Sequence, residues 1–258
     1  MKEKIHVLLK HGPVYWTINS TYRLIAWVCF FLFEYLAMAM LQSSIVFSGR
    51  ERYLLLLCGL LLTYSFIRFS FQTLNGGTSW LKSARQKKRS WFKSIEWPKR
   101  SEWLLLAAIY LISLSGMMIW GVFEQLFLYK WVSGTTENQA ALNSLMNIGG
   151  LYSTIFLSLI IVILGPIMEE LVFRGLFFHY FKWVKAPWVT IILSGLLFGI
   201  YHLGSYTWLS LFDLPPYFII GMGLAYAYQK TGKLSSSILM HMFHNGWIQV
   251  MSLLVLFH

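Results

Sequence analysis

Residues 151–178 read LYSTIFLSLIIVILGPIMEELVFRGLFF, and this stretch decides the fold. A helix needs roughly 20 apolar residues to cross the hydrocarbon layer of a membrane, and this run is long enough to do so. The run nevertheless contains Glu169, Glu170 and Arg174. Ionisable side chains are costly in a bilayer unless they are paired or hydrated, so this cluster indicates a functional site.

The composition places the rest of the chain in the membrane as well. Of the 258 residues, 57% are hydrophobic and 12% are charged, whereas a soluble domain carries about 25% charged residues. The net charge of +11 would suit a nucleic-acid-binding protein. However, the basic residues lie in short loops between apolar runs and form no face of a soluble fold. We therefore expect no nucleic-acid partner.

Seven apolar runs predict an all-α fold, a polytopic transmembrane helical bundle with about seven spanning helices, six and eight being the alternatives. The runs cover residues 23–47, 53–74, 103–123, 151–178, 188–203, 216–228 and 236–257. The sixth run is short and rich in small residues (Gly221, Gly223, Ala225 and Ala227), a composition typical of a helix packed tightly against others. The two cysteines, Cys29 and Cys58, lie in separate runs, and we expect no disulfide between them.

The distribution of positive charge predicts the orientation. If the N-terminus is cytoplasmic, sixteen of the 21 Lys and Arg residues lie in inner segments and three lie in outer ones. This asymmetry predicts a multi-pass protein of the cell membrane, with its N-terminus inside and its C-terminus outside.

The same reading divides the chain into parts. Residues 1–22 form a cytoplasmic N-terminal segment, 23–123 hold the N-terminal transmembrane helices with a basic cytoplasmic loop at 75–102, and 150–258 form the core with the charged cluster. We interpret the basic loop as a determinant of topology, with a lipid- or partner-binding segment as the alternative. The outer connection 124–150 is interpreted as an ordinary loop, with a lid or substrate rim as the alternative.

Helical spacing separates the roles of the charged residues in the core. Side chains four residues apart share a helix face, so Glu170 and Arg174 are expected to form an ion pair. Glu169 points about 100° away and stays free for other work. Pro166 and Gly175 flank the cluster, and both can loosen or kink the helix where a water-filled cavity has to open.

Two further motifs lie in later helices, Phe198-x-x-x-His202 and His241-x-x-x-Asn245. His241 and Asn245 share a helix face, so a ring N–H and an amide N–H could converge on one oxygen as in an oxyanion hole. Glu169 and His202 could activate a water molecule directly. Alternatively, Glu169, His202 and His241 could hold a zinc ion with an open position, and the spacing leaves both possibilities open.

Three other polar residues lie in apolar runs. We interpret His244 as a packing residue. Glu34 and Arg68 could pair across the hairpin of the first two helices, or each could reach a neighbouring helix, and we expect both to lie outside the site. From the distance to the inner loops, we expect the site to be reached from the cytoplasmic side.

The three motifs stand in order as EELVFR (169–174), FGIYH (198–202) and HMFHN (241–245), and together they resemble the signature of a protein family. This is the CAAX protease and bacteriocin-processing family, also called Abi or CPBP, of intramembrane metallopeptidases. The resemblance covers roughly residues 150–250. It implies that 150–258 is a catalytic protease core and leaves open whether a divalent metal such as zinc is required.

The resemblance also implies a role for each motif residue. Glu169 and His202 would activate the attacking water, and His241 and Asn245 would hold the tetrahedral oxyanion. Glu170 and Arg174 would support the site.

The leading hypothesis is therefore an intramembrane endopeptidase that cleaves a peptide or a membrane-protein substrate in the lipid bilayer. Members of the bacterial branch of the family are linked to bacteriocin immunity and peptide processing. The alternative is a non-catalytic membrane protein for immunity or signalling, which binds a bacteriocin receptor or a sensor kinase. An ion-coupled transporter ranks last, because the sequence shows no internal repeat.

Overall fold

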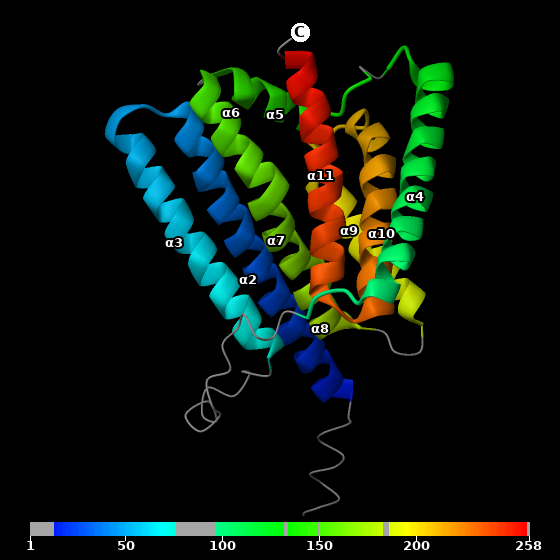
Figure 1. The fold of residues 1–258 in the computed structure, drawn as a ribbon. Helices are drawn as coiled ribbons and strands as arrows, with labels where there is room; N and C mark the ends of the chain where they lie inside the picture. The colour runs from blue at the N-terminus through cyan, green and yellow to red at the C-terminus, as the bar shows by residue number, and fades with distance from the viewer. Residues whose placement is uncertain (1–12, 76–95, 132–133, 149, 183–185, 257–258) are drawn as a thin grey trace, which may run out of the picture.

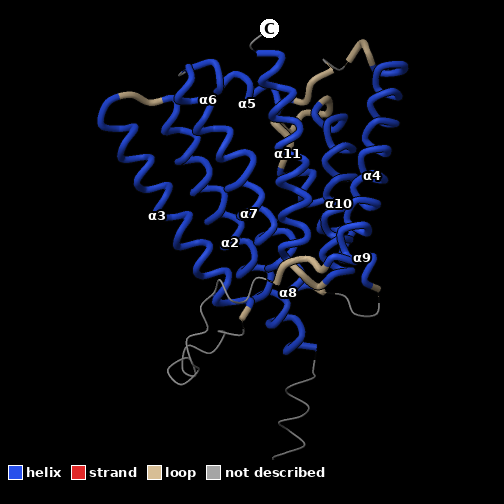
Figure 2. Tube along the Cα trace, in the orientation of Figure 1, coloured by secondary structure: helices blue, strands red, loops and turns tan. Residues whose placement is uncertain are grey.

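The computed structural model describes residues 13–75, 96–131, 134–148, 150–182 and 186–256 (Figure 1). These ranges consist of helices joined by turns and loops, and they contain no strand (Figure 2). The predicted all-α, polytopic helical bundle is confirmed. Most of the predicted basic loop lies outside the described residues, as do residues 1–12 of the predicted N-terminal segment.

Eight longer helices follow one another along the described part of the chain. They are α2 (Pro13–Val46), α3 (Gly49–Leu74), α4 (Arg100–Phe123), α5 (Glu137–Ile148), α6 (Gly150–Leu159), α9 (Pro187–Tyr201), α10 (Leu214–Thr231) and α11 (Leu234–Leu256). Shorter segments complete the described chain: η2 (Glu124–Leu128), η3 (Ile160–Leu164), α7 (Gly165–Glu170), η4 (Leu171–Leu176), α8 (Phe177–Phe181) and η5 (Ser210–Asp213).

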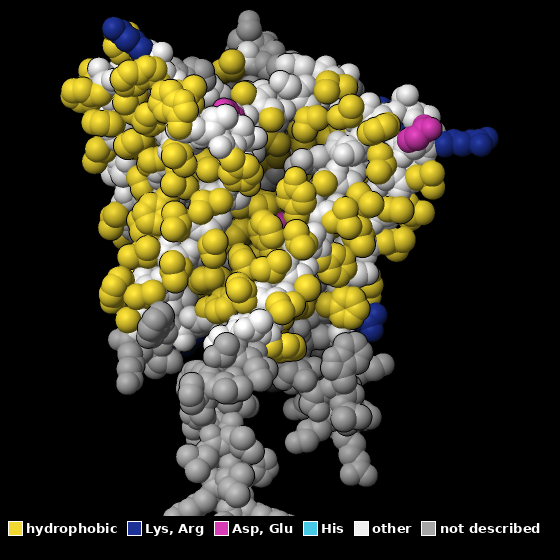
Figure 3. All heavy atoms as spheres, turned by 180° about the vertical axis from the view of Figure 1, so that it is seen from behind, with side chains coloured by type: hydrophobic (Ala, Val, Ile, Leu, Met, Phe, Trp, Pro, Cys, Tyr) yellow, Lys and Arg dark blue, Asp and Glu magenta, His cyan; other side chains and the backbone are white. Residues whose placement is uncertain are grey.

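Each of the seven predicted runs corresponds to a helical segment, and the runs 23–47 and 188–203 extend one and two residues past the ends of α2 and α9. Five segments are long and apolar enough to span a membrane, namely Ser20–Val46, Gly49–Leu74, Arg100–Leu128, Gly150–Phe181 and Leu234–Val255. The fifth predicted run is the shorter apolar helix α9. On the face that Figure 3 shows, apolar side chains cover the surface between the two ends of the molecule, and Lys and Arg lie near those ends. Such a surface suits a lipid environment.

The helices run between two ends that differ in their connections (Figure 1). One end holds the start of α2, the end of α3 and the start of α4. The other end holds α5 and the end of α11. We call these the N-terminal end and the α5 end. Because α9 and α11 run towards the α5 end while α7 and α10 run away from it, their polar residues can meet near the middle.

The run that carries the charged cluster is not one regular helix. It consists of α6, η3, α7, η4 and α8, in which η3 and η4 are π-helical and Pro166 lies in the first turn of α7. Single π turns inside an α-helix occur frequently at functional sites. The sequence predicts a loosening near Pro166 and Gly175, and the structure places a π segment before Pro166 and another that includes Gly175.

Helices α9 and α10 approach each other closely through glycine. A Cβ atom at Gly195 would lie 2.8 Å from the Cγ atom of Met222 and 2.9 Å from its backbone nitrogen. A Cβ atom at Gly221 would lie 3.0 Å from the Gly195 carbonyl oxygen. The small residues of α10 are all buried, so the predicted tight packing of this helix is confirmed.

Helix α2 is attached to the middle of the bundle by an aromatic cluster. Trp27 packs edge-on against Phe173 and Phe177, and its Nε1–H donates a hydrogen bond of 3.1 Å to the carbonyl oxygen of Val172. Val172 and Phe173 belong to η4, where every residue is buried. This contact fixes α2 against the segment that contains Arg174.

Candidate active site

The predicted site residues lie together although they come from three separate parts of the chain. Glu169 of α7, His202 at the end of α9, and His241 and Asn245 of α11 line one cavity of about 230 Å³. Glu170 and Arg174 lie behind them with no exposed side-chain surface. A hollow is visible in the apolar face that Figure 3 shows.

Glu170 and Arg174 form the ion pair that their spacing predicts. Arg174 Nη1 lies 2.7 Å from Glu170 Oε1, and Nη2 donates a hydrogen bond of 2.8 Å to the Gly221 carbonyl oxygen of α10. The guanidinium group also lies 4.5 Å from the ring centroid of Phe198. A buried charge pair of this kind needs additional hydrogen bonds to offset its desolvation, and these contacts supply them while they join η4 to α9 and α10.

Glu170 also determines how His241 is protonated. Its Oε1 atom lies 2.9 Å from His241 Nδ1. Because the ion pair with Arg174 keeps Glu170 an acceptor, Nδ1 carries the hydrogen, and in the neutral ring Nε2 then has a lone pair. This lone pair faces Glu169, whose Oε2 atom is 3.8 Å away.

The ring of His202 has the same arrangement. Its Nδ1 lies 2.9 Å from the Phe198 carbonyl oxygen, which can only accept, so Nδ1 is the donor. The Nε2 atom of His202 lies 3.5 Å from Glu169 Oε2. Tyr217 stacks on the His202 ring with a centroid distance of 4.8 Å and holds its plane.

Three acceptor atoms therefore converge in the cavity: Glu169 Oε2 and the Nε2 atoms of His202 and His241. Their separations of 3.5 and 3.8 Å are too long for good direct hydrogen bonds. Glu169 Oε2 is buried and has no hydrogen-bond partner among the described residues. A polar contact of this length suits a bridging water molecule, which can donate two hydrogen bonds into such a set.

Lone pairs of carboxylate and imidazole are also the type that binds zinc. Among the described residues, however, no group of three His, Cys, Asp or Glu side chains has the arrangement that a metal ion needs. We therefore assign no chemical step to a metal.

Asn245 and His244 complete the side of the cavity formed by α11. Asn245 Nδ2 donates a hydrogen bond of 2.9 Å to the carbonyl oxygen of Ile161 in η3. An amide has two N–H groups, so one remains for another acceptor. His244 Nδ1 lies 3.5 Å from the hydroxyl of Tyr110 on α4, and its ring packs edge-on against the same tyrosine. This contact agrees with its interpretation as a packing residue.

Glu34 lies closer to the site than the sequence suggests. Its side chain is fully buried, and its Oε1 atom accepts a hydrogen bond of 3.1 Å from the hydroxyl of Tyr201, which lines the cavity beside His202. Arg68, in contrast, is exposed. The alternative that the structure bears out for Glu34 is the contact with a neighbouring helix. The partners are 167 residues apart, which is why spacing did not reveal them.

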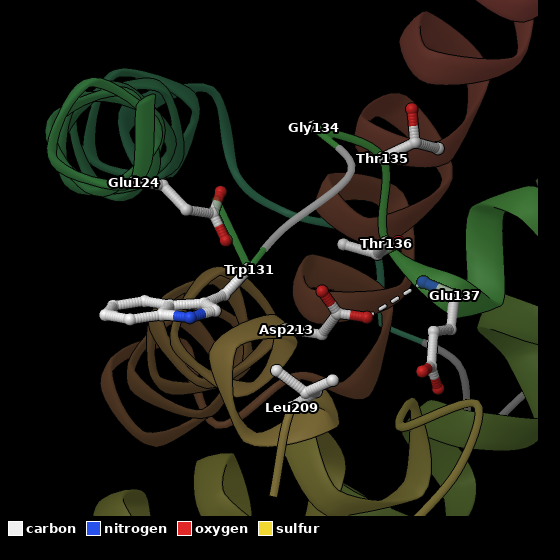
Figure 4. A pocket seen from close by; sticks show the side chains of 8 residues that line it. All are labelled: Glu124, Trp131, Gly134, Thr135, Thr136, Glu137, Leu209 and Asp213. Atoms are coloured by element: carbon white, nitrogen blue, oxygen red, sulfur yellow. Dashed lines mark hydrogen bonds between the residues drawn. The ribbon is translucent and has the colours of Figure 1, made fainter. Parts of the chain in front are cut away.

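The connection 124–150 is not an ordinary loop. Residues 137–148 form α5, and its residues Asn138, Gln139 and Leu142 line the cavity. The Glu137 backbone N–H donates a hydrogen bond of 2.8 Å to Asp213 Oδ2, which satisfies an N-terminal amide of α5. Figure 4 shows this bond in a second, smaller pocket of about 170 Å³.

The same helix shows from which end the cavity is reached. Thr136, which precedes α5, lies 2.8 Å from the Tyr217 hydroxyl, so the α5 segment is joined to the cavity wall. Among the described residues, the lining includes α5 and none from the connections of the N-terminal end. The described lining therefore extends towards the end opposite the basic loops, whereas we expected access from the cytoplasmic side.

Comparisons with known proteins give one family and two relatives. Residues 151–247 match the family described as type II CAAX prenyl endopeptidase Rce1-like. The UPF0177 protein YbdI of Lactococcus lactis subsp. lactis is 30% identical over 119 residues, which cover 46% of this chain and 60% of that protein. An uncharacterized protein of Mycoplasma capricolum subsp. capricolum is 34% identical over 117 residues, which cover 43% of this chain and 33% of that protein.

The chain thus spans less than two thirds of the length of both curated relatives. No solved structure matches this chain significantly. The matched family segment contains all six predicted site residues, whereas α2, α4 and α5 lie outside it.

Proposed function

Because residues 151–247 belong to the Rce1-like family of type II CAAX prenyl endopeptidases, we propose that this protein is an intramembrane endopeptidase that cleaves a peptide or membrane-protein substrate. The observation that carries the proposal is the convergence of Glu169, His202 and His241 in one buried cavity. Three acceptors that face one another suit a water molecule that is about to lose a proton.

In the proposed mechanism, a water molecule bound between Glu169 and His202 attacks the scissile carbonyl carbon. Glu169 takes the proton of the water as general base, and His202 orients it through Nε2. The proton then passes to the nitrogen of the scissile bond, so that the peptide bond breaks into a carboxylic acid and an amine.

The oxyanion that develops on the scissile carbonyl needs hydrogen-bond donors on the side away from Glu169 and His202. Asn245 supplies its second N–H, and His241 supplies Nε2–H while its ring holds the water proton passed on by Glu169, whose Oε2 atom lies 3.8 Å from Nε2. Removing one such donor typically lowers the rate about 10²–10³-fold. Glu170 and Arg174 act through His241 and do not contact the substrate.

The proposal includes an orientation in the membrane. The N-terminus and the basic segment between α3 and α4 are cytoplasmic, and the chain is a multi-pass protein of the cell membrane. The excess of Lys and Arg in the segments of that end supports this orientation.

Comparative peptide mapping tests the function. Membrane and secreted fractions are compared between cells with the wild-type protein and cells with Glu169→Gln at equal expression. Glu51→Gln, which changes an exposed carboxylate at the start of α3, serves as the matched control. We expect a peptide terminus that appears with the wild type and with Glu51→Gln and disappears with Glu169→Gln.

Identical maps for all three proteins would contradict proteolysis. If the Glu169→Gln protein also kept the wild-type phenotype, a non-catalytic binding role in immunity or signalling would replace our proposal. A chelator added to the active membranes tests for a metal: loss of processing that zinc restores would show a metal requirement, and continued processing would show that Glu169 and His202 activate the water without one.

A further inference from the structure

The cavity has a direction within the molecule. The predicted catalytic atoms lie near the middle of the bundle, where α7 and α11 cross the membrane. From there the lining continues to α5 through Gln42 in the later half of α2 and Tyr217 in the first turns of α10. Both positions are nearer to the α5 end than to the N-terminal end (Figure 1).

Positive charge gathers at the opposite end. The described Lys and Arg residues of the N-terminal end are Arg23, Lys99, Arg100, Lys182, Lys230 and Lys233. The sequence between the end of α3 and the start of α4, which both lie at this end, contains Lys82, Arg85, Lys87, Lys88, Arg89 and Lys93. Membrane proteins keep such segments in the cytoplasm.

The α5 end has the reverse balance. Its described positive residues are Arg50, Arg52 and Lys130, and its negative residues are Glu51, Glu124, Glu137 and Asp213. By the same rule, this end faces away from the cytoplasm. The cavity and the basic segments therefore lie on opposite sides of the membrane.

The lining also limits the chemistry of what can enter. Between the catalytic atoms and α5 it presents the amides of Gln42, Asn138, Gln139 and Gln249, and no Lys, Arg or Asp is among the described lining residues. Gln139 and Gln249 donate both of their Nε2–H groups to neighbouring side chains, so these two amides leave only their acceptor oxygens for the N–H groups of an extended peptide backbone. A charged side chain would meet no opposite charge in this part of the cavity.

From these observations we infer that the substrate is an extended peptide segment without charged side chains near its scissile bond, presented on the non-cytoplasmic side of the membrane. The cleavage step rests on the proposed function, whereas the side of access rests on the fold and the charge distribution. The two are tested separately.

Cysteine labelling tests the side of access. Single cysteines are placed in a chain that carries Cys29→Ser and Cys58→Ser. Leu142→Cys lies in the cavity wall, Ser144→Cys is exposed on α5, and Ser101→Cys is exposed at the start of α4. Ser144→Cys and Ser101→Cys are the same substitution at the two ends, so they are matched controls.

Spheroplasts are treated with a charged maleimide that does not cross membranes. We expect Leu142→Cys and Ser144→Cys to be labelled at once, and Ser101→Cys to be labelled only after the membrane is opened. Labelling of Ser101→Cys together with protection of Ser144→Cys would overturn the orientation. Labelling of Ser144→Cys without Leu142→Cys would overturn access to the cavity from that side.

The substrate class is tested on the processed peptides. The maleimide should stop processing in intact Leu142→Cys cells and leave it unchanged in Ser144→Cys cells. The new termini should lie in non-cytoplasmic segments and be flanked by uncharged residues, and flanking Lys, Arg, Asp or Glu would overturn the class. If neither the wild-type chain nor any cysteine variant processes a peptide, the proposed function fails. The labelling result still decides the side of access.

Discussion

At the scale of single residues, the hydrogen-bond partner of each histidine Nδ1 determines whether Nε2 of that ring presents a lone pair to the cavity. His202 and His241 both give their Nδ1–H to a fixed acceptor, a carbonyl oxygen in one case and a carboxylate in the other. Both rings therefore present Nε2 to Glu169. The Nδ1 atom of His244 instead faces the Tyr110 hydroxyl at 3.5 Å, which can donate as well as accept and so does not fix the hydrogen on Nδ1.

This difference predicts unequal effects of removing the rings. His202→Ala should abolish processing, because no other Nε2 atom can orient the water beside Glu169. His244→Ala removes a ring of the same kind from the same cavity and should retain most of the activity. The measurement is the rate of product formation at equal protein levels. Equal losses in the two variants would contradict the assignment.

The charge of Glu170 should matter more for stability than any exposed charge. Glu170→Gln leaves Arg174 buried without a counter-charge, and breaking a buried pair in this way costs about 3–5 kcal/mol. Arg68→Gln changes an exposed charge of α3 and should alter stability by less than about 0.5 kcal/mol. The measurement is the thermal unfolding midpoint of the two variants in detergent. Similar midpoints would show that the Glu170–Arg174 ion pair does not support the site.

At the scale of elements, the sequence predicts what is local and misses what is distant. Four-residue spacing predicts the Glu170–Arg174 pair, and apolar runs predict each spanning segment. The segment ENQAALNSLMNI (137–148) is too polar to be recognised as part of a membrane bundle, and it became helix α5. Its place in the cavity wall depends on contacts with Asp213 and Tyr217, more than 70 residues away.

The close contact of α9 and α10 should be sensitive to a single methyl group. Gly195→Ala would place Cβ against the Met222 backbone, and overpacking of this kind costs about 1–3 kcal/mol. The shift should also lower activity, because Arg174 is bonded to the neighbouring Gly221 carbonyl. Gly121→Ala on α4 meets nothing within 4 Å and should be neutral or stabilising. The measurement is the thermal unfolding midpoint, and a lower midpoint for Gly121→Ala than for Gly195→Ala would refute the predicted effect of close packing.

At the scale of the whole molecule, the predicted division into N-terminal helices and a catalytic core remains a prediction. The motifs lie in residues 169–245, yet α2 supplies Tyr35, Met38 and Gln42 to the cavity wall and attaches to η4 through Trp27. Sequence motifs cannot reveal this dependence, because these four residues belong to no recognisable pattern.

The core should therefore be inactive alone. A chain of residues 129–258 should give no processing, and co-expression of residues 1–128 should restore it in the membrane. The same N-terminal fragment with Trp27→Ala should restore less, because the anchoring ring and its hydrogen bond are lost. Activity of the 129–258 fragment alone would show that α2 only covers the core.

The convergence of Glu169 Oε2 with the two histidine Nε2 atoms also bears on how the protein could be studied. A buried acceptor without a donor lowers the stability of the folded state, and natural proteins tolerate such positions where activity requires them. Glu169→Met should raise the unfolding midpoint in detergent although it ends processing, and a lower midpoint would count against this view. The form of this protein best suited to crystallisation would then be one that can no longer work.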